Sequence, residues 1–282
     1  MKNLIVTHHN GDISNNWDKI TRFRLFLKSL SDLNEPSIDL VLFSDHIEIF
    51  REIGKEFTSL NIIYVEDLFE KNGNASVSRF ICYLKFLPLF KKKYQKIIHC
   101  DCMDVCFLTN PFPLINKKLL VCEESDDLLF KDESINCAWA DPLPDSKKEL
   151  FYNTFIICDG FIASCDIDTF INYSMKLLFQ YEVTPKNDTL FEVHADQPLT
   201  NYLARTVDYV TVLPLRNNIV RHLLRVREKV TPEYLMEASI VHFTMINNNS
   251  YEIKDWLCSK FEIDGSPIVN IVYDPFTRTY HF

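Results

Sequence analysis

The sequence predicts an α/β fold in which helices cover both faces of a mostly parallel central sheet. Through the first hundred residues, short apolar runs alternate with longer stretches whose apolar residues recur at helical spacing, which is typical of such sheets. The chain has 282 residues, of which 47% are hydrophobic, so it can bury a substantial core. No internal repeat, low-complexity run or linker divides it. We therefore expect residues 1–282 to form a single domain.

The first half of the chain is expected to form four strands separated by three helices. The strands are predicted at Leu4–Thr7, Ile38–Phe43, Asn61–Val65 and Lys96–Cys100, and the helices at Ile20–Leu30, Ile47–Phe57 and Ser76–Phe90. Ser76 suits the N-cap of the third helix, because serine accepts hydrogen bonds from the first free N–H groups. Pro88 is expected to disrupt the last turn of the same helix.

The second half of the sequence is less regular. The acidic segment Glu123–Asp145 contains Pro142 and Pro144, which predicts a long excursion from the core. The remaining strands are predicted at Thr154–Cys158, Phe161–Ala163, Val210–Leu213 and Ser239–Phe243, and the remaining helices at Ile167–Gln180 and Asp196–Thr206.

Composition excludes several kinds of ligand site. The chain has only five glycines, none within ten residues of another, so it contains neither a G-x-G-x-x-G dinucleotide fingerprint nor a P-loop. Its formal net charge of −9 gives no general field that would attract nucleic acid, so we expect no nucleic-acid partner. An acidic protein that handles a diphosphate needs a divalent cation between its carboxylates and the phosphate oxygens.

The sequence also predicts a cytoplasmic protein with no transmembrane segment. The first apolar run is shorter than the 7–15 residues, roughly, that a signal peptide needs, and no run approaches the length of a membrane helix. Nine irregularly spaced cysteines indicate free thiols in a reducing compartment. Cys100, Cys102 and Cys106 cluster, but no second Cys/His pair stands nearby at zinc spacing, so we interpret them as structural.

Polar residues follow the predicted parallel strands, where such sheets bind ligands. They are Thr7, His8 and Asn10 after the first strand, Asp45 after the second, and Asp101 and Asp104 after the fourth. Two carboxylates in the turn after a strand can converge on a hard cation such as Mn²⁺ or Mg²⁺. Aspartate is also a common turn residue, and the spacing alone leaves both interpretations open.

The segment from Asp101 to Phe112, Asp-Cys-Met-Asp-Val-Cys-Phe-Leu-Thr-Asn-Pro-Phe, resembles the metal-binding strand end of nucleotide-sugar glycosyltransferases of the GT-A type. The D-x-D motif of that family is replaced here by D-x-x-D-V, followed by Pro-Phe. The resemblance implies a GT-A-like, Rossmann-like fold in which Asp101 and Asp104 hold Mn²⁺ or Mg²⁺ against the diphosphate of the donor. It implies a nucleotide-sugar-binding half at 1–113 and an acceptor-side half at 114–282 that includes a C-terminal metal-ligand segment.

Two further segments support this resemblance. Ser-Arg79-Phe-Ile-Cys-Tyr-Leu-Lys85 resembles the helix before the acidic motif, which implies that Arg79, and with it Lys85, faces the donor diphosphate. The alternative for Arg79 is an exposed position on the helix surface. Asp159-Gly160 lies where the family has an Asn-x-Gly strand beside the donor sugar. Asn153 or Asp159 takes the polar role there. Asp159, next to Gly160, fits better and is assigned the catalytic role, and Gly160 allows close backbone approach.

The remaining matches lie later in the chain. Asp196-Gln197 resembles the Asp-Gln helix start of these enzymes, where Asp196 binds acceptor hydroxyls or acts as the base of an inverting reaction. The alternative for Asp196 is a helix N-cap. His242 resembles the late histidine that completes the metal shell, although a histidine after an apolar strand is often structural. At the first two strand ends, Thr7, His8, Asn10 and Asp45 correspond to the place where the family holds the nucleotide.

The sequence therefore predicts a metal-dependent glycosyltransferase. It would move a sugar from a nucleotide-diphosphate sugar, most suitably a UDP-sugar, to a hydroxyl of a glycan, a protein or a small molecule. The D-x-x-D spacing and the missing N-x-G triplet keep a second class open, a non-catalytic nucleotide- or sugar-binding module. A nucleotidyltransferase is a third possibility, but the glycine-rich, basic loop usual after its first strand is missing from Thr7–Gly11. Inversion or retention at the anomeric carbon is left open.

Overall fold

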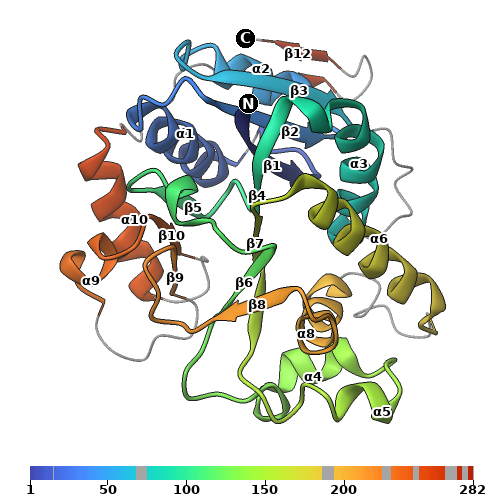
Figure 1. Ribbon diagram of the computed structural model, residues 1–282. Helices are drawn as coiled ribbons and strands as arrows, with labels where there is room; N and C mark the ends of the chain where they lie inside the picture. The colour runs from blue at the N-terminus through green and yellow to red at the C-terminus, as the bar shows by residue number, and fades with distance from the viewer. Residues whose placement is uncertain are drawn as a thin grey trace.

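The computed structural model describes residues 1–14, 16–67, 75–185, 194–223, 230–243, 248–263, 272–274 and 279–281, and within them the central sheet has seven strands. They are β1 (Lys2–His9), β2 (Ile38–Ser44), β3 (Asn61–Glu66), β4 (Tyr94–Cys100), β6 (Leu119–Glu123), β7 (Ile157–Ser164) and β8 (Val210–Leu213). Their order across the sheet is β3-β2-β1-β4-β7-β6-β8 (Figure 1).

Strand directions create a switch point at the centre of this sheet. β1 pairs in parallel with β2 on one side and with β4 on the other, and β2 pairs in parallel with β3. The chain moves outward from β1 to β3 and then returns to β4, so ligands are expected beyond the carboxyl ends of β1 and β4. β7 runs antiparallel to both β4 and β6, while β8 is parallel to β6. The mostly parallel α/β sheet is thus confirmed, with β7 as the exception.

Helices cover both faces of the sheet, as expected. Along β1, Leu4 and Val6 pack with α3 (Ala75–Phe90), α6 (Ile167–Val183) and α8 (Asp196–Thr206), whereas Ile5 packs with α1 (Trp17–Asp32) and α2 (Ile47–Gly54) on the other face. This alternation follows from the two-residue period of a strand. The side chains of Leu4, Ile5 and Val6 are completely buried.

Two expectations for α3 were wrong in detail. The helix begins at Ala75, so Ser76 lies inside its first turn and is not the N-cap. The helix also continues through Pro88 to Phe90. Tertiary packing outweighs the cost of the proline, since Leu87 is buried and Phe86 stacks on Phe90.

The structure adds elements to the second half of the chain. The unexpected strand β6 is a short apolar run buried on both faces, which periodicity does not distinguish from other buried segments. The acidic excursion holds α4 (Ser134–Ala140) and α5 (Asp145–Lys148), with Pro142 and Pro144 between them. Single 3₁₀ turns lie at Lys91–Lys93, Phe112–Leu114 and Phe130–Asp132. The two strands predicted at Thr154–Cys158 and Phe161–Ala163 form the one strand β7.

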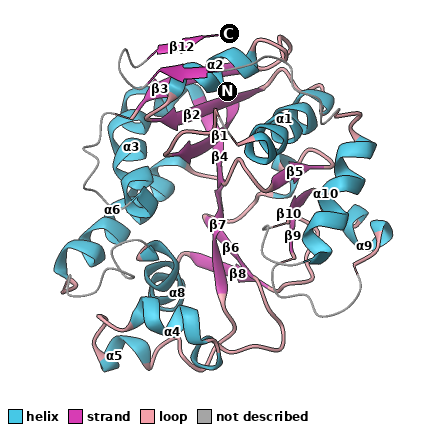
Figure 2. Cartoon of the chain, turned by 180° about the vertical axis from the view of Figure 1, so that it is seen from behind, coloured by secondary structure: helices cyan, strands magenta, loops and turns pink. Residues whose placement is uncertain are grey.

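A second, smaller sheet lies beside the first and has the order β5-β10-β9. Its strands are β5 (Val105–Phe107), β9 (Val220–His222) and β10 (Ile240–His242). Figure 2 shows these strands with α9 (Pro232–Met236) and α10 (Asn248–Lys260) to one side of the central sheet. Leu235, Val241, Phe243 and Leu257 form its buried core. β5 starts directly after Asp104, and its partner β10 ends at His242. The pairing of these two strands therefore brings two predicted metal ligands together.

Two further observations complete the fold. The short strands β11 (Val272–Asp274) and β12 (Thr279–His281) pair antiparallel. Among the helices that the structure describes, none has the length and apolar character needed to cross a membrane.

Candidate metal and donor site

The three predicted metal ligands converge at the carboxyl end of β4. Ligand atoms of Asp101, Asp104 and His242 all lie within 4.8 Å of one another. His242 Nε2 is 3.4 Å from Oδ1 of Asp104 and 4.0 Å from Oδ2 of Asp101. The backbone N–H of Phe243 donates to the carbonyl of Asp104 at 2.8 Å, which ties the end of β10 to the acidic loop. Two carboxylates and an imidazole suit Mn²⁺.

The unsatisfied atoms of this cluster fit a cation. Asp104 Oδ1 and His242 Nε2 are buried, and neither has a hydrogen-bond partner in the part of the chain that the structure describes. Burial alone would lower the pKa of His242, but the charges of Asp104 and Asp101 outweigh burial and raise it to about 8. Burial would raise the pKa of Asp104, yet His242 lowers it. The site therefore favours added positive charge.

Arg79 of α3 faces this site rather than the solvent. Its Nη1 is 3.0 Å from Oδ1 of Asp101 and its Nη2 is 3.2 Å from Oδ2 of Asp196. Burial opposes its charge, but the carboxylates of Asp196 and Asp101 raise its pKa further. His99 Nε2 lies 3.2 Å from Nη1, and His99 Nδ1 lies 2.9 Å from the hydroxyl of Tyr83. The sequence interpretation missed His99 and Tyr83, although Tyr83 stands one helical turn after Arg79.

Asp159 and Asp196 form a second carboxyl pair next to Arg79. Burial, and then the charge of Asp196, raises the pKa of Asp159 well above its ordinary value, and the two side chains share a hydrogen bond. Burial therefore favours the neutral form of Asp159, which lies within hydrogen-bonding reach of Asp196. The Asp159 N–H donates to Oε1 of Gln197 at 3.0 Å. The side-chain amide of Asn201 exchanges two hydrogen bonds of 2.9 Å with the backbone of Ile157, which fixes α8 against β7.

Asp196 is the first residue of α8, and the N-cap position belongs to Ala195. The N-cap alternative for Asp196 is therefore wrong. Its side chain is only 3% exposed, and its Oδ1 accepts from the N–H of Gln197 at 3.1 Å. One carboxylate oxygen thus contacts the first turn of α8, while Oδ2 faces Arg79.

Gly160 touches the metal-ligand side chains. A Cβ atom at this position would lie 2.6 Å from Cε1 of His242 and 2.7 Å from Oδ2 of Asp101. The carbonyl of Gly160 also accepts from the N–H of Asp101 at 3.3 Å. Gly160 therefore has no room for a side chain beside the predicted metal ligands, while close approach to a donor sugar stays a prediction.

At the end of β1, Thr7 and His8 are buried in the wall of the same region. Thr7 is fully buried, and its hydroxyl oxygen has no hydrogen-bond partner in the part of the chain that the structure describes. His8 Nε2 lies 2.7 Å from Oδ2 of Asp67, which follows β3. The His8 side chain thus contacts Asp67 and stabilises the ends of β1 and β3.

Asn10, Asp45 and Lys85 lie further out. The Asn10 Oδ1 atom is buried without a hydrogen-bond partner in the described ranges. Asp45 accepts from the N–H of Gly11 at 2.9 Å, which stabilises the turn after β1 at a position with a φ of 101°. Lys85 is exposed, and six residues after Arg79 it faces about 120° away around the helix. The contacts that join Arg79 to the carboxylates do not include it.

A histidine that the sequence interpretation missed lies behind His242. In the parallel pairing of β9 and β10, His222 is the register partner of His242, and their Nδ1 atoms are 3.0 Å apart. Cys158 Sγ lies 3.6 Å from the same Nδ1 of His242. The repeated pattern of a short apolar run that ends in histidine, Ile219-Val-Arg-His and Ile240-Val-His, is the signal that could have found it.

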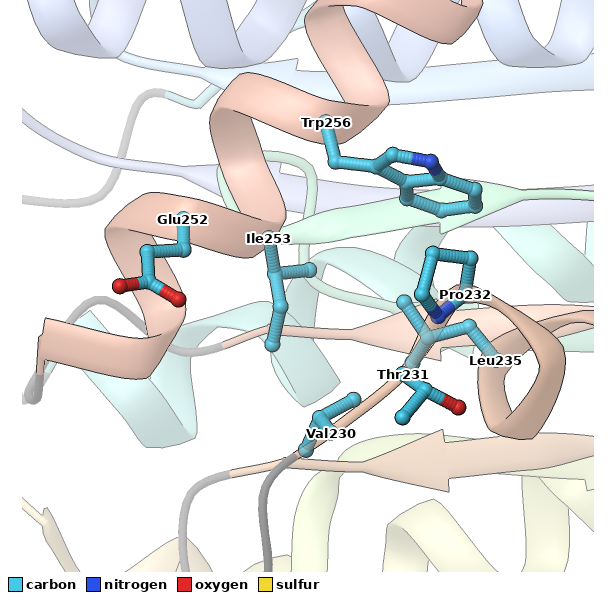
Figure 3. A pocket seen from close by; sticks show the side chains of 7 residues that line it. All are labelled: Val230, Thr231, Pro232, Leu235, Glu252, Ile253 and Trp256. Carbon is cyan, nitrogen blue, oxygen red and sulfur yellow. The ribbon is translucent and has the colours of Figure 1, made fainter.

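A separate pocket of about 210 Å³ lies between α9 and α10. In Figure 3, Trp256 and Ile253 of α10 face Pro232 and Leu235 of α9. The lining residues are Val230, Thr231, Pro232, Leu235, Glu252, Ile253 and Trp256. None of them belongs to the carboxylate cluster.

Comparison with solved structures supports the fold assignment. Mouse xyloside xylosyltransferase 1, in its apo form, aligns with a TM-score of 0.53 and 13% sequence identity over 89% of this chain and 99% of that chain. The GT-A-like architecture is thereby confirmed.

Two more distant structures also align. A glycosyltransferase involved in glycosylation of the major capsid of PBCV-1 gives a TM-score of 0.46 at 13% identity, over 91% of this chain and 99% of that chain. The 4-diphosphocytidyl-2C-methyl-D-erythritol synthase of Anaerococcus prevotii gives 0.45 at 15% identity, over 76% and 88%. No protein-family model and no curated protein sequence matches the chain.

Proposed function

We propose that this protein is a metal-dependent glycosyltransferase that moves a sugar from a nucleoside-diphosphate sugar to an acceptor hydroxyl. The observation that carries the proposal is the convergence of Asp101, Asp104 and His242 at the switch point of a glycosyltransferase-like sheet. A UDP-sugar is the proposed donor, and a glycan, protein or small molecule the acceptor. Residues 1–113 would supply the nucleotide side, and residues 114–282 the acceptor side together with His242.

Asp101, Asp104 and His242 would hold Mn²⁺, or Mg²⁺ with less help from the imidazole. A cation bound there would neutralise the negative charge that develops on the departing diphosphate. Arg79 holds Asp101 and Asp196 in place, since its two terminal nitrogens each face one of these carboxylates. We therefore assign Arg79 first to positioning the acidic groups, and second to attracting the phosphates.

The Asp159–Asp196 pair would bind hydroxyl groups. Two carboxyl groups that share a hydrogen bond offer a donor and acceptors, which together match a sugar hydroxyl. If the reaction inverts, Asp196 is the proposed base. Asp196→Asn should then lower transfer by at least about 100-fold while donor binding survives. Asp159→Asn tests the other member of the pair separately. Full transfer by the Asp196 variant would overturn the base assignment.

The direct test combines binding and turnover. A panel of nucleotide sugars would be screened by thermal shift with and without Mn²⁺, because a ligand that binds the folded state raises the melting temperature. Release of the nucleoside diphosphate would then be measured with the best donor. We expect cation-dependent release that an acceptor accelerates. Binding without turnover would indicate a non-catalytic module. Pyrophosphate release from a nucleoside triphosphate and a sugar phosphate would indicate a nucleotidyltransferase.

A further inference from the structure

Two buried imidazole rings meet behind the metal-ligand cluster. His222 and His242 are 1% and 3% exposed and stand side by side on β9 and β10. Their Nδ1 atoms face each other at 3.0 Å, while Nε2 of His242 faces the carboxylates of Asp101 and Asp104. His242 thus presents one nitrogen to the acidic cluster and the other to His222.

The chemistry of the ring limits how this contact works. A neutral imidazole carries one N–H and one lone pair, and two nitrogens at 3.0 Å share a single hydrogen. For Nε2 of His242 to bind a cation, its hydrogen must sit on Nδ1, and the acceptor found there is Nδ1 of His222. The remaining hydrogen of His222 then lies on its own Nε2.

We propose that His222 is a positioning residue of the cation site. Its Nδ1 lone pair accepts the N–H of His242 Nδ1, which leaves the His242 Nε2 lone pair free to bind a cation together with Asp101 and Asp104. Metal-bound histidines commonly need such a hydrogen-bond acceptor behind the ring. This inference rests on the cation site of the proposed function, and it does not depend on sugar transfer.

The same atoms allow one other arrangement. Cys158 Sγ, at 3.6 Å from Nδ1 of His242, could join both histidines around a thiolate-binding cation such as Zn²⁺. A cation there would use the Nδ1 lone pair of His242, so Nε2 would keep its hydrogen and could not bind a second cation. A cation held by the paired carboxylates in front of Nε2 needs the Nε2 lone pair, and the hydrogen-bonded arrangement supplies it.

The test is a Mn²⁺ titration followed by electron paramagnetic resonance on the whole chain. His222→Leu removes the acceptor and should weaken Mn²⁺ binding by about 10- to 100-fold. His222→Asn places an amide oxygen near the former Nδ1 and should restore most of the affinity. His222→Gln places its amide near the former Nε2 and should remain as weak as the leucine variant. The asparagine–glutamine contrast holds even if leucine impairs folding, which melting temperatures would reveal.

Cys158→Ala is the control, and it should leave Mn²⁺ affinity unchanged. Equal affinity of wild type and His222→Leu would overturn the proposal, as would an asparagine variant as weak as the glutamine variant. Tight Zn²⁺ binding that Cys158→Ala abolishes would establish the thiolate arrangement instead. Wild-type protein that leaves the free Mn²⁺ signal unchanged would overturn the cation site and this role of His222. Intact Mn²⁺ binding without any sugar transfer would contradict the proposed function alone.

Discussion

The two edges of the parallel strands hold aspartates in opposite surroundings. At the amino edge, Asp39 is completely buried and accepts from Nζ of Lys2 at 2.5 Å, Nδ2 of Asn61 at 2.6 Å and the hydroxyl of Tyr94 at 3.0 Å. Nζ of Lys93 lies 2.9 Å away. Burial would raise the pKa of Asp39, but the hydrogen bonds from Lys2 and Lys93 lower it to about 2. One carboxylate here has several donors.

At the carboxyl edge, several carboxyl groups share few hydrogen-bond donors. Asp101 and Asp196 share the guanidinium of Arg79, and burial together with the charge of Asp196 raises the pKa of Asp159 beside them. Oδ1 of Asp104 lies 3.4 Å from Nε2 of His242, and neither atom has a hydrogen-bond partner in the described ranges. The same residue type is surrounded by donors at one edge and by other carboxylates at the other, which is the edge where we propose that a cation binds.

Among the substitutions that test this comparison, Asp104→Asn is expected to change Mn²⁺ affinity most. The amide keeps the shape but removes a charge and a ligand, so Mn²⁺ affinity should fall by more than about 100-fold, and sugar transfer with it. The melting temperature of the cation-free protein should hold or rise, because a buried carboxylate is removed. Mn²⁺ titration and thermal denaturation check both parts. Unchanged Mn²⁺ affinity would show that Asp104 is not a ligand.

Gly160→Ala is expected to give the next largest effect. The new Cβ would displace the Asp101 carboxylate and the His242 ring, so Mn²⁺ affinity should fall by about 10- to 100-fold. Gly54→Ala is the matched control, since its Cβ would press on the Tyr64 hydroxyl, outside the cluster. The control should lower the melting temperature without changing Mn²⁺ affinity. Loss of stability without loss of affinity in the Gly160 variant would return this glycine to a purely structural role.

Asp39→Asn tests the opposite edge. Losing charged hydrogen bonds should lower the free energy of unfolding by about 1–3 kcal/mol at pH 7 and leave Mn²⁺ affinity unchanged. The pKa of Asp39 is lowered from 3.8 to about 2, so its contribution is present above 3.8 and is lost as the pH falls through about 2. Urea denaturation at several pH values should show the two proteins converging in that window. A pH-independent difference would mean that packing, and not charge, stabilises this edge.

The sequence was sufficient to predict the sheet and the residues at its strand ends. Alternating strands and helices place Thr7 and Asp101 at one edge, because parallel strands end on the same side. The structure confirms the mostly parallel sheet and adds β6, which was not predicted. The first four residues of β6 are apolar and buried, so they carry no periodic signal.

The closure of the candidate site depends on contacts between distant segments. His242 reaches Asp104 only because β10 pairs with β5, more than a hundred residues earlier in the chain. His99 and His222 end or nearly end apolar strands, where a histidine is hard to distinguish from a structural core residue without knowing its neighbours. Likewise, the pairing of Arg79 with two carboxylates depends on how α3 lies against β4 and α8.

The smallest effect is expected from Lys85→Ala, and it sharpens the comparison by contrast with Arg79→Gln. Both cations lie on α3, but Arg79 is buried between two carboxylates whereas Lys85 is exposed to solvent. Removing an exposed charge should change Mn²⁺ and UDP-sugar affinity by less than about twofold at physiological salt. Arg79→Gln leaves Asp101 and Asp196 without their shared cation, so it should lower stability and disturb both affinities. Parallel titrations of the two variants decide the matter. A large loss of UDP-sugar affinity in the Lys85 variant would instead show that Lys85 contacts the donor. The donor site would then reach beyond Arg79 and the carboxylates around it.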